Sequence, residues 1–300
     1  MAASTPALSP ARVWWSAVRP ATLAASVAPV LAGTAVALHD GGVRPAAGLG
    51  ALVVAISLQV GVNFANDYSD FVRGVDTPQR TGPLRASASG VVMPGNVRRA
   101  AIAAFALAGA VGLFVSLATD WRLLIVGAAC LLAGWLYTGG PRPYGYLGLG
   151  EVFVFVFFGL VATCGTAYVN ELRVTPLAIL AGCGMGFLAS AVLVLNNLRD
   201  IETDAATGKR TLATLIGRER TLVLLVVLVC GAFAVPIVIL VTHQAAVTVM
   251  AVHFGIPIAS VPVRTAFATK SGPPLVGALR RMAATELAYA LLLTAGLLLR

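Results

Sequence analysis

The sequence is poor in charged residues. Only 11% of its 300 residues are Asp, Glu, Lys or Arg, whereas 58% are hydrophobic. A typical water-soluble domain carries roughly 25% charged residues, so this composition excludes an ordinary soluble globule. The chain is therefore predicted to be an integral membrane protein.

Cysteine and histidine are also scarce, and neither occurs in a metal-binding pattern. The 4 cysteines stand singly in apolar segments, and none of the 3 histidines has another plausible ligand nearby in the sequence. Zinc sites and thiol redox motifs need Cys or His residues at characteristic short spacings. The sequence therefore argues against a zinc centre and against thiol redox chemistry.

Long apolar segments are what the sequence has instead. A transmembrane helix needs roughly 20 mostly apolar residues. Nine segments of about this kind occur, at 20–38, 46–66, 100–118, 122–137, 150–169, 176–195, 221–242, 246–266 and 283–299. The predicted fold class is all-α, a bundle of nine transmembrane helices in a single domain over residues 1–300, with an N-terminal cytoplasmic segment at 1–15.

The distribution of basic residues predicts the orientation in the membrane. Cytoplasmic loops of membrane proteins carry an excess of Lys and Arg. With the N-terminus in the cytoplasm and the C-terminus outside, every Lys and Arg lies on the cytoplasmic side except Arg44, Arg122, Arg173 and Arg300. The net charge of +9 is therefore interpreted as a topology signal, and no nucleic-acid partner is expected. The excess of Arg over Lys and the many alanines are typical of a GC-rich bacterial genome, which favours a bacterial plasma membrane.

The two long cytoplasmic loops, 67–99 and 196–220, carry similar acidic motifs. Each begins with the pattern N-x-x-x-D and continues to a further Asp. Residues four apart lie on one face of a helix, so each motif presents a stripe of oxygen ligands. Two facing stripes would form a cage for a hard cation such as Mg²⁺, which a bound diphosphate would complete. The predicted metal ligands are Asn66, Asp70, Asp76, Asn196, Asp200 and Asp204.

Basic residues accompany both acidic motifs. Arg80 and Arg85 follow the first motif, Lys209 and Arg210 follow the second, and Arg73 and Arg199 lie within or beside them. Such cations can bind diphosphate oxygens and stabilise the negative charge that develops as diphosphate leaves. The matching motifs also suggest that helices one to four and five to eight are related halves, with the ninth helix an addition.

A Gly/Pro-rich connection between the fourth and fifth helices is a third candidate. It places Tyr137, Arg142 and Glu151 on the same face as the acidic motifs. These residues could line a pocket for a nucleophilic substrate, although Gly and Pro also simply form turns. Four phenylalanines follow in the fifth helix, where they could stabilise a carbocation or merely pack. They are Phe153, Phe155, Phe157 and Phe158.

Together these motifs resemble the UbiA superfamily of intramembrane aromatic prenyltransferases over nearly the whole chain. Four sequence segments carry the resemblance: Arg19 to Leu23, Asn66 to Asp70 with Gly74 and Asp76, Tyr137 to Pro141 with Gly150 and Glu151, and Asn197 to Asp204 followed by Gly208 to Leu212. Within the superfamily, they are most similar to the branch that prenylates 1,4-dihydroxy-2-naphthoate in menaquinone biosynthesis. Gly74 departs from the usual pattern, which has an Asp there, so direct metal binding by Asp76 stays open.

The resemblance implies an Mg²⁺-dependent reaction inside the lipid bilayer. A polyprenyl diphosphate would lose its diphosphate, and the naphthoate ring would attack the allylic cation and lose its carboxylate. The catalytic residues implied are Asp67, Asp70, Asp200, Asp204 and Tyr137. Alternatives are another acceptor, such as 4-hydroxybenzoate, haem, homogentisate or a phosphosugar, and a cation-coupled transporter, against which the clustering of acidic residues on one face argues.

Overall fold

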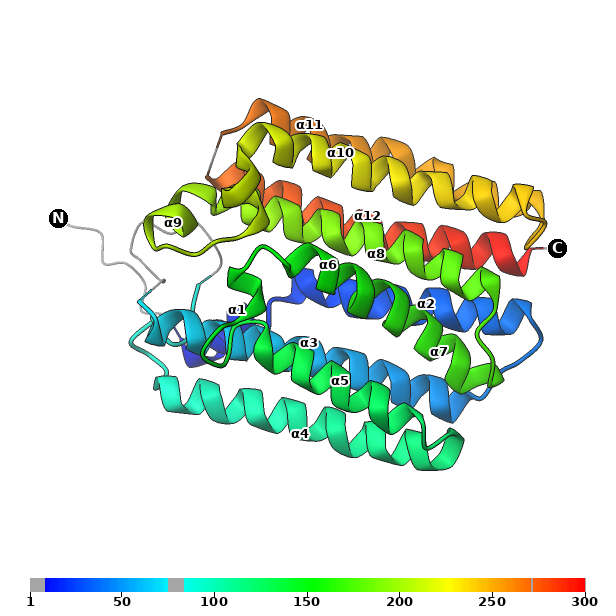
Figure 1. The fold of residues 1–300 in the computed structure, drawn as a ribbon, viewed down its shortest axis with the longest axis horizontal. Helices are drawn as coiled ribbons and strands as arrows, with labels where there is room; N and C mark the ends of the chain where they lie inside the picture. Colours follow the sequence, from blue (N-terminus) through cyan, green and yellow to red (C-terminus); the bar gives the residue numbers. More distant parts are fainter. Residues whose placement is uncertain (1–8, 75–83, 271, 300) are drawn as a thin grey trace.

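The computed structural model describes residues 9–74, 84–270 and 272–299, and the regular elements in these ranges are helices. The long helices run side by side as one bundle (Figure 1). Eight helical segments are long and apolar enough to cross a membrane. The predicted all-α, multi-pass membrane fold is therefore confirmed.

The first half of the chain forms five helices. They are α1 (Pro10–Val18), α2 (Pro20–His39), α3 (Pro45–Val72), α4 (Pro94–Thr119) and α5 (Leu123–Leu136). The first four each have Pro in the first turn, where the missing N–H leaves no helical hydrogen bond unmade. The fifth, α5, has only 14 residues and falls short of the length of a full span.

In the described part of the second half there are five more spans and two short connecting elements. A 3₁₀ turn, η1 (Tyr144–Tyr146), precedes a continuous span made of α6 (Gly150–Val154), the π-helix η2 (Phe155–Val161) and α7 (Ala162–Glu171). The remaining elements follow in chain order: α8 (Pro176–Arg199), α9 (Ile201–Ala206), α10 (Leu212–Val241), the 3₁₀ helix η3 (Val247–Gly255) with α11 (Ile256–Ala268), and α12 (Pro273–Leu298).

Each of the nine predicted apolar segments forms a helix, but their ends and number differ from the prediction in detail. The short α5 makes nine spans an approximate count, and α1 occupies part of the segment predicted as N-terminal loop. With 9 residues, this helix is too short to cross a membrane by itself, and it forms the start of the first candidate span, Pro10–His39. It packs Val13 and Ala17 inward, while Trp15 is exposed. The predicted loops are also partly helical, because α3 and α8 continue beyond the apolar residues to Val72 and Arg199.

The bundle buries its apolar residues around α8 and leaves others on its outer surface. The larger core joins α2, α7, α8, α10 and α12, and a smaller one joins α1, α3 and α4. Large apolar side chains such as Phe114 and Phe254 are 72% and 79% exposed. Outward-facing apolar residues of this size are what a lipid-facing surface requires, since lipid tails are themselves apolar.

A close helix contact places Gly159 of η2 against Gly186 of α8. A methyl group on Gly159 would lie 2.3 Å from the Gly186 Cα atom, a backbone atom that cannot move aside alone. We expect Gly159→Ala to destabilise the fold by about 1–3 kcal/mol, the usual cost of overpacking. Thermal unfolding of the purified protein in detergent measures this loss as a lower Tm.

Gly165 supplies the matched control for this substitution. It lies in the same span, and a methyl group there would meet no atom within 4 Å. Gly165→Ala should therefore leave the Tm unchanged or raise it slightly, because Ala favours a helix over Gly. Equal Tm values for the two variants would contradict the assignment of Gly159 to a packing role.

Candidate functional site

A cavity of about 480 Å³ lies among helices α2 to α8. Its mouth is lined by ionic and amide side chains from the ends of α3 and α8, and its interior is lined by apolar side chains of α3, α4, α5, η2 and α7. On α3 the lining residues run from Asp70 to Ala51. At roughly 1.5 Å rise per residue this stretch is about 28 Å long, close to the thickness of a membrane's hydrocarbon core.

The first acidic motif lies on the last turns of α3 and faces the mouth. Asp70 is buried, and its two oxygens have different partners: Oδ1 accepts a hydrogen bond from the Tyr146 hydroxyl at 2.6 Å, and Oδ2 pairs with Arg85 at 2.5 Å. Asn66 also lines the cavity, and its Oδ1 accepts a hydrogen bond from Thr138 at 2.7 Å. Both predicted ligands are therefore held in fixed positions.

Asp67 is placed differently from its predicted catalytic neighbours. It does not line the cavity, and its carboxylate accepts hydrogen bonds from the backbone N–H groups of Ala86 and Ser87, both at 2.8 Å. These bonds fix the loop that carries Arg85. Asp67 therefore anchors the loop that places Arg85 at the mouth of the cavity.

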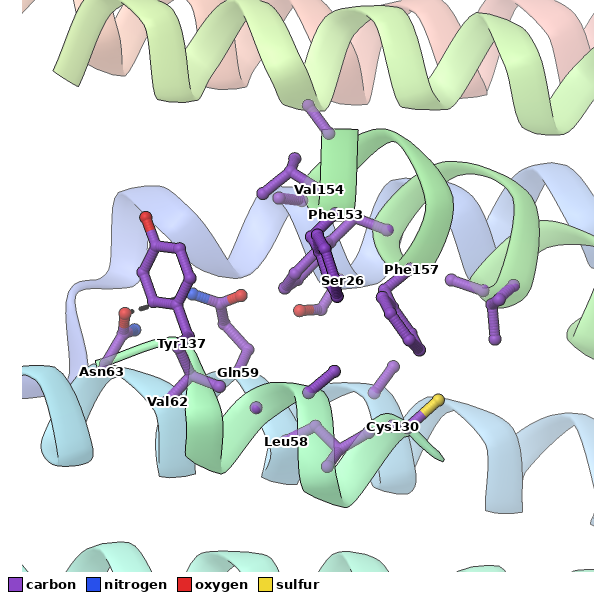
Figure 2. Close-up of a pocket in the computed structure, with 18 of the residues that line it drawn as sticks. Ser26, Leu58, Gln59, Val62, Asn63, Cys130, Tyr137, Phe153, Val154 and Phe157 are labelled. Atoms are coloured by element: carbon purple, nitrogen blue, oxygen red, sulfur yellow. Dashed lines mark hydrogen bonds between the residues drawn. The ribbon is translucent and has the colours of Figure 1, made fainter. Parts of the chain in front are cut away.

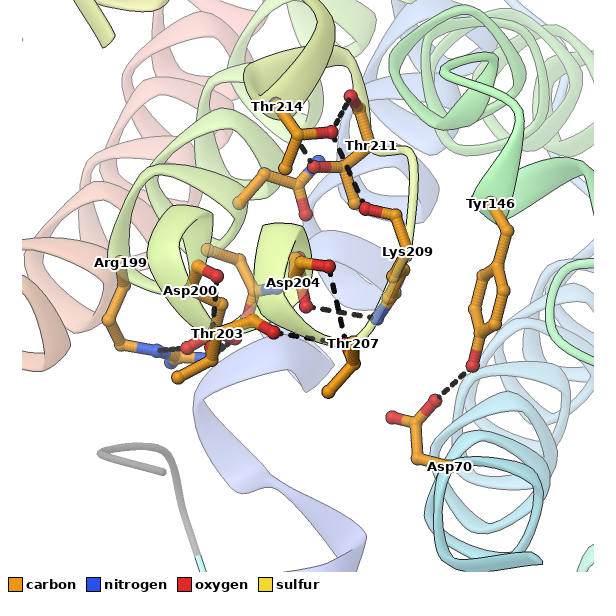
Figure 3. A network of polar contacts seen from close by, with 12 residues as sticks. Asp70, Tyr146, Arg199, Asp200, Thr203, Asp204, Thr207, Lys209, Thr211 and Thr214 are labelled. Carbon is orange, nitrogen blue, oxygen red and sulfur yellow. Dashed lines mark hydrogen bonds and ion pairs between the residues drawn. The ribbon is translucent and has the colours of Figure 1, made fainter. Parts of the chain in front are cut away.

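The second acidic motif spans the end of α8 and the short helix α9. Asn196, Asp200 and Asp204 all line the cavity. Asp200 forms a two-bond ion pair with its neighbour Arg199, at 2.8 and 2.5 Å, and Asn196 Oδ1 accepts from the same guanidinium at 3.0 Å. Lys209 lies 3.8 Å from Asp204, an ion pair too long for a normal hydrogen bond (Figure 3).

The two motifs line the same cavity. Among the described residues, no group of three or more Asp, Glu, His or Cys side chains converges on one metal position. Each motif instead contributes its own carboxylate and amide oxygens. This donor set fits Mg²⁺, which is usually held by one or two carboxylates and takes its other ligands from water and phosphate.

The predicted cations separate into those that reach the cavity and those that do not. Arg85 and Lys209 line it, and so does Arg19, which was not predicted. Arg199 is buried beside Asp200 just outside the lining. Arg142 and Arg210 are exposed and lie outside the lining, so the prediction that they contact substrate gains no support. Asp76 and Arg80 lie outside the described residues.

The Gly/Pro-rich connection contributes more to the mouth than was predicted. Tyr137 lines the cavity, whereas Glu151 does not and accepts a hydrogen bond from Asn197 at 2.9 Å. Asn197 lines the cavity in turn, so Glu151 has an indirect role in shaping it. Arg73 also points to this connection, where it donates to the Gly140 carbonyl at 2.6 Å.

Tyr146 is the main residue that the sequence interpretation missed. Its hydroxyl donates to Asp70, and its ring lies between two cations, with Arg73 at 5.4 Å and Lys209 at 5.1 Å from the ring centroid. Burial raises the pKa of Tyr146, and the nearby Asp70 carboxylate raises it further, so the phenol keeps its proton. The only signal in the sequence is a second tyrosine in the turn that also contains Tyr144.

A polar band separates the ionic mouth from the apolar interior. Gln59 donates to Thr22 at 3.2 Å and to Asn63 at 3.1 Å, and Asn63 donates to the Val18 carbonyl at 2.8 Å. In Figure 2 Gln59, Asn63 and Tyr137 gather at one end of the cavity, and Phe153 and Phe157 lie beyond them.

Aromatic rings form one wall just beyond this polar band. Tyr144 stacks on Phe153 with centroids 4.0 Å apart, and Phe153 is 6.0 Å from Phe157. All three line the cavity. From the mouth inward, the cavity surface is thus ionic, then polar, then aromatic and finally aliphatic. This order suits a long apolar molecule with an anionic head group.

The bundle and its cavity define a polytopic membrane protein with a cavity whose lining suits an amphiphilic anion. The model of the UbiA prenyltransferase family matches residues 26–274, and the chain therefore belongs to this family.

Individual relatives agree with the family assignment. The chain is 43% identical to a 1,4-dihydroxy-2-naphthoate octaprenyltransferase of Mycobacterium leprae (strain TN) over 270 residues, which cover 89% of this chain and 90% of that protein. It is 48% identical over 210 residues to a protein of the same name from Mycobacterium tuberculosis (strain ATCC 25618 / H37Rv), with coverage of 69% and 71%.

Solved structures agree in fold. A UbiA homolog from Aeropyrum pernix K1 in its apo form superposes with a TM-score of 0.68 at 14% identity, covering 95% of this chain and 97% of that one. A UbiA homolog from Archaeoglobus fulgidus bound to GPP and Mg²⁺ superposes with a TM-score of 0.61 at 16% identity, covering 93% and 99%. At these identities the likeness establishes the fold alone.

Proposed function

We propose that this protein transfers a polyprenyl group from polyprenyl diphosphate to 1,4-dihydroxy-2-naphthoate in an Mg²⁺-dependent reaction. The observation that carries the proposal is the cavity itself, which leads from a mouth lined by acidic and basic side chains into an apolar interior. Its lining along α3 is about as long as a bilayer core is thick. The names of the mycobacterial relatives supply the acceptor and the class of donor.

In this proposal the diphosphate head group lies at the mouth between the two acidic motifs. Mg²⁺ would be held there by Asn66, Asp70, Asn196, Asp200 and Asp204, and would neutralise diphosphate charge as the leaving group departs. Arg85 and Lys209, which line the same mouth, supply further positive charge to the departing oxygens. The prenyl tail occupies the apolar interior among α3, α4, α5 and α7.

The acceptor ring is proposed to lie at the polar band. The reacting carbon of the donor is attached directly to the diphosphate, so the acceptor must meet it where the mouth joins the apolar interior. Gln59, Asn63 and Tyr137 offer hydrogen-bonding groups there, and the ring of Tyr144 with Phe153 offers a flat aromatic surface. Burial of the site in the bundle would keep water from capturing the allylic cation that forms when the diphosphate leaves.

In the proposed prenyl transfer, the C1–O bond of the prenyl diphosphate breaks and its electron pair leaves with the diphosphate. The electron-rich naphthoate ring then forms a C–C bond to C1, and its carboxylate leaves as CO₂, so the product is demethylmenaquinol. Menaquinone biosynthesis consumes this product.

The same proposal fixes location and orientation. The basic loops would face the cytoplasm of a bacterial cell, with the N-terminus inside and the C-terminus outside the plasma membrane. The two acidic motifs lie at one end of the bundle, and the end of α12 lies at the other (Figure 1). The chain would act as a single transmembrane domain over residues 1–300.

The deciding measurement is product formation by membranes that contain this protein. Given octaprenyl diphosphate and 1,4-dihydroxy-2-naphthoate, they should release pyrophosphate and form a prenylated naphthoquinol only when Mg²⁺ is present, and EDTA should stop the reaction. Prenylation of 4-hydroxybenzoate or homogentisate instead would overturn the acceptor alone. Absence of pyrophosphate release with every acceptor would overturn the enzyme assignment and favour a transporter.

A further inference from the structure

Tyr146 contacts groups from both acidic loops. Its hydroxyl donates to Asp70 Oδ1 at 2.6 Å, and its ring centroid is 5.1 Å from the amino group of Lys209, which follows the second motif. Arg73, at the end of α3, lies over the same ring at 5.4 Å. The inference drawn from these contacts rests on the proposed function.

Backbone contacts support the same connection. Leu147, the next residue, forms a parallel bridge with Arg210, the residue after Lys209. A methyl group on the following Gly148 would lie 2.6 Å from Leu215, so the two loops pack directly against each other there. The ring of Tyr146 is therefore carried by a turn that is attached to the second acidic loop, while its hydroxyl reaches the first.

Its neighbour Tyr144, in the same turn, directs its hydroxyl to a different partner. The Tyr144 hydroxyl donates to the backbone carbonyl of Ala133 at 2.8 Å and so ties the turn to α5. Both tyrosines belong to η1 and both line the cavity. Only Tyr146 directs its hydroxyl to a carboxylate of the acidic motifs.

The hydrogen bond from Tyr146 restricts how the Asp70 carboxylate can turn. With Oδ1 bonded to Tyr146 and Oδ2 paired with Arg85, the carboxylate plane is fixed at both oxygens. Hydrogen bonds to a metal-binding carboxylate orient it, and losing one typically costs roughly 10- to 100-fold in metal affinity or activity. Asp70 is the carboxylate of the first motif that lines the mouth.

The ring of Tyr146 acts on the second loop through charge. Lys209 lies between the ring and Asp204, and the 3.8 Å separation from Asp204 is longer than a hydrogen bond. The face of an aromatic ring attracts a cation electrostatically. The ring thus keeps the Lys209 amino group over the mouth, where a diphosphate oxygen can reach it.

We propose that Tyr146 is a positioning residue that holds Asp70 of the first motif and Lys209 of the second around one magnesium diphosphate. Its hydroxyl orients the carboxylate, and its ring positions the ammonium group. The two parts of the side chain therefore have separable effects. Removing the hydroxyl affects the metal, and removing the ring also affects the diphosphate.

Three variants test this assignment: Tyr146→Phe, Tyr146→Leu and the control Tyr168→Phe, whose lost hydroxyl donates to the Asp120 carboxylate outside the cavity. Activity is measured against Mg²⁺ and against polyprenyl diphosphate, and binding of inorganic pyrophosphate with Mg²⁺ is measured by calorimetry without turnover. Tyr146→Phe should raise the Mg²⁺ concentration for half-maximal activity about tenfold or more. Tyr146→Leu should in addition raise KM for the prenyl diphosphate and weaken pyrophosphate binding.

The control separates the role of Tyr146 from the loss of a hydroxyl as such. Tyr168→Phe should leave the Mg²⁺ dependence unchanged, although it also removes a hydroxyl that donates to a carboxylate. Unchanged Mg²⁺ dependence and pyrophosphate binding in Tyr146→Phe would overturn the role of Tyr146 while leaving the proposed function intact. A wild-type protein that binds no magnesium pyrophosphate would overturn both.

Discussion

Replacing Asp70 or Asp200 with Asn should abolish prenyl transfer while leaving a folded protein. Each carboxylate lines the cavity mouth, and each is a predicted ligand of Mg²⁺ in a different motif. Asn keeps the shape and one oxygen but loses the charge that holds the metal. We expect turnover to fall on the order of 10³-fold for either variant, which corresponds to about 4 kcal/mol of transition-state stabilisation.

Asn is preferred to Ala here because its amide oxygen can still accept a hydrogen bond from the buried basic partner, Arg85 for Asp70 and Arg199 for Asp200. Ala would leave that buried guanidinium with neither the charge nor the hydrogen bond. The exposed Glu202, on α9 between Asp200 and Asp204, is the control, and Glu202→Gln should keep its activity. Wild-type rates in both Asn variants would refute the proposed site, provided that each retains the wild-type Tm.

The double variant Asp70→Asn with Asp200→Asn tests whether the two motifs act as a unit. If both serve one magnesium diphosphate, the second substitution should add little to the first, because residues of one catalytic unit are strongly non-additive. Independent sites would multiply the two losses. Residual activity of the double variant against that of each single variant gives the answer.

Gly165→Phe should separate long prenyl donors from short ones. Gly165 lines the apolar interior on α7, and a side chain there would enter open space, with no atom within 4 Å of its Cβ. A phenyl ring in that space would obstruct the path of a long tail. We expect the rate with octaprenyl diphosphate to fall at least tenfold, while geranyl diphosphate, whose chain is much shorter, keeps its rate.

Gly277→Phe provides the comparison for this variant. Gly277 lies on α12, lines no part of the cavity, and also has open space around its Cβ. It introduces the same side chain into a helix, so any general effect on folding or membrane insertion should appear there too. Equal losses with both donors in Gly165→Phe would contradict the placement of the tail.

Ion pairs balance the charges at the mouth. Among the described residues, the motif carboxylates that line the mouth, Asp70, Asp200 and Asp204, each face a cation of the chain, namely Arg85, Arg199 and Lys209. A charge buried near the membrane is costly unless it is paired. In the proposed reaction the carboxylates would hold the metal and the cations would pair with diphosphate oxygens, so the charge balance would be preserved.

The sequence alone predicted the fold class and the location of most spans, because hydrophobic length is a local property. It also identified the two acidic motifs, since N-x-x-x-D depends only on helical spacing. The ends of the helices were predicted less well. Polar residues such as Asp70 and Asp200 interrupt the apolar pattern, yet α3 and α8 continue through or up to them.

Roles within the motifs could not be predicted from spacing. Asp67 and Asp70 are three residues apart on one helix, but one bonds to the backbone of Ala86 and Ser87 and the other faces the cavity. Glu151 likewise has its partner, Asn197, on another helix. In both cases the deciding contact comes from a segment distant in sequence.

The sequence by itself determined that this protein lies in the membrane and carries two loops rich in acidic and basic residues. The length of an apolar segment and the charges of a loop are local properties of the sequence, so they do not depend on packing. Only the tertiary structure decided that the two motifs stay apart across one cavity, and that Tyr146 connects them. Those features depend on how α3, α8 and the turn before α6 pack together, and local spacing contains no information about that packing.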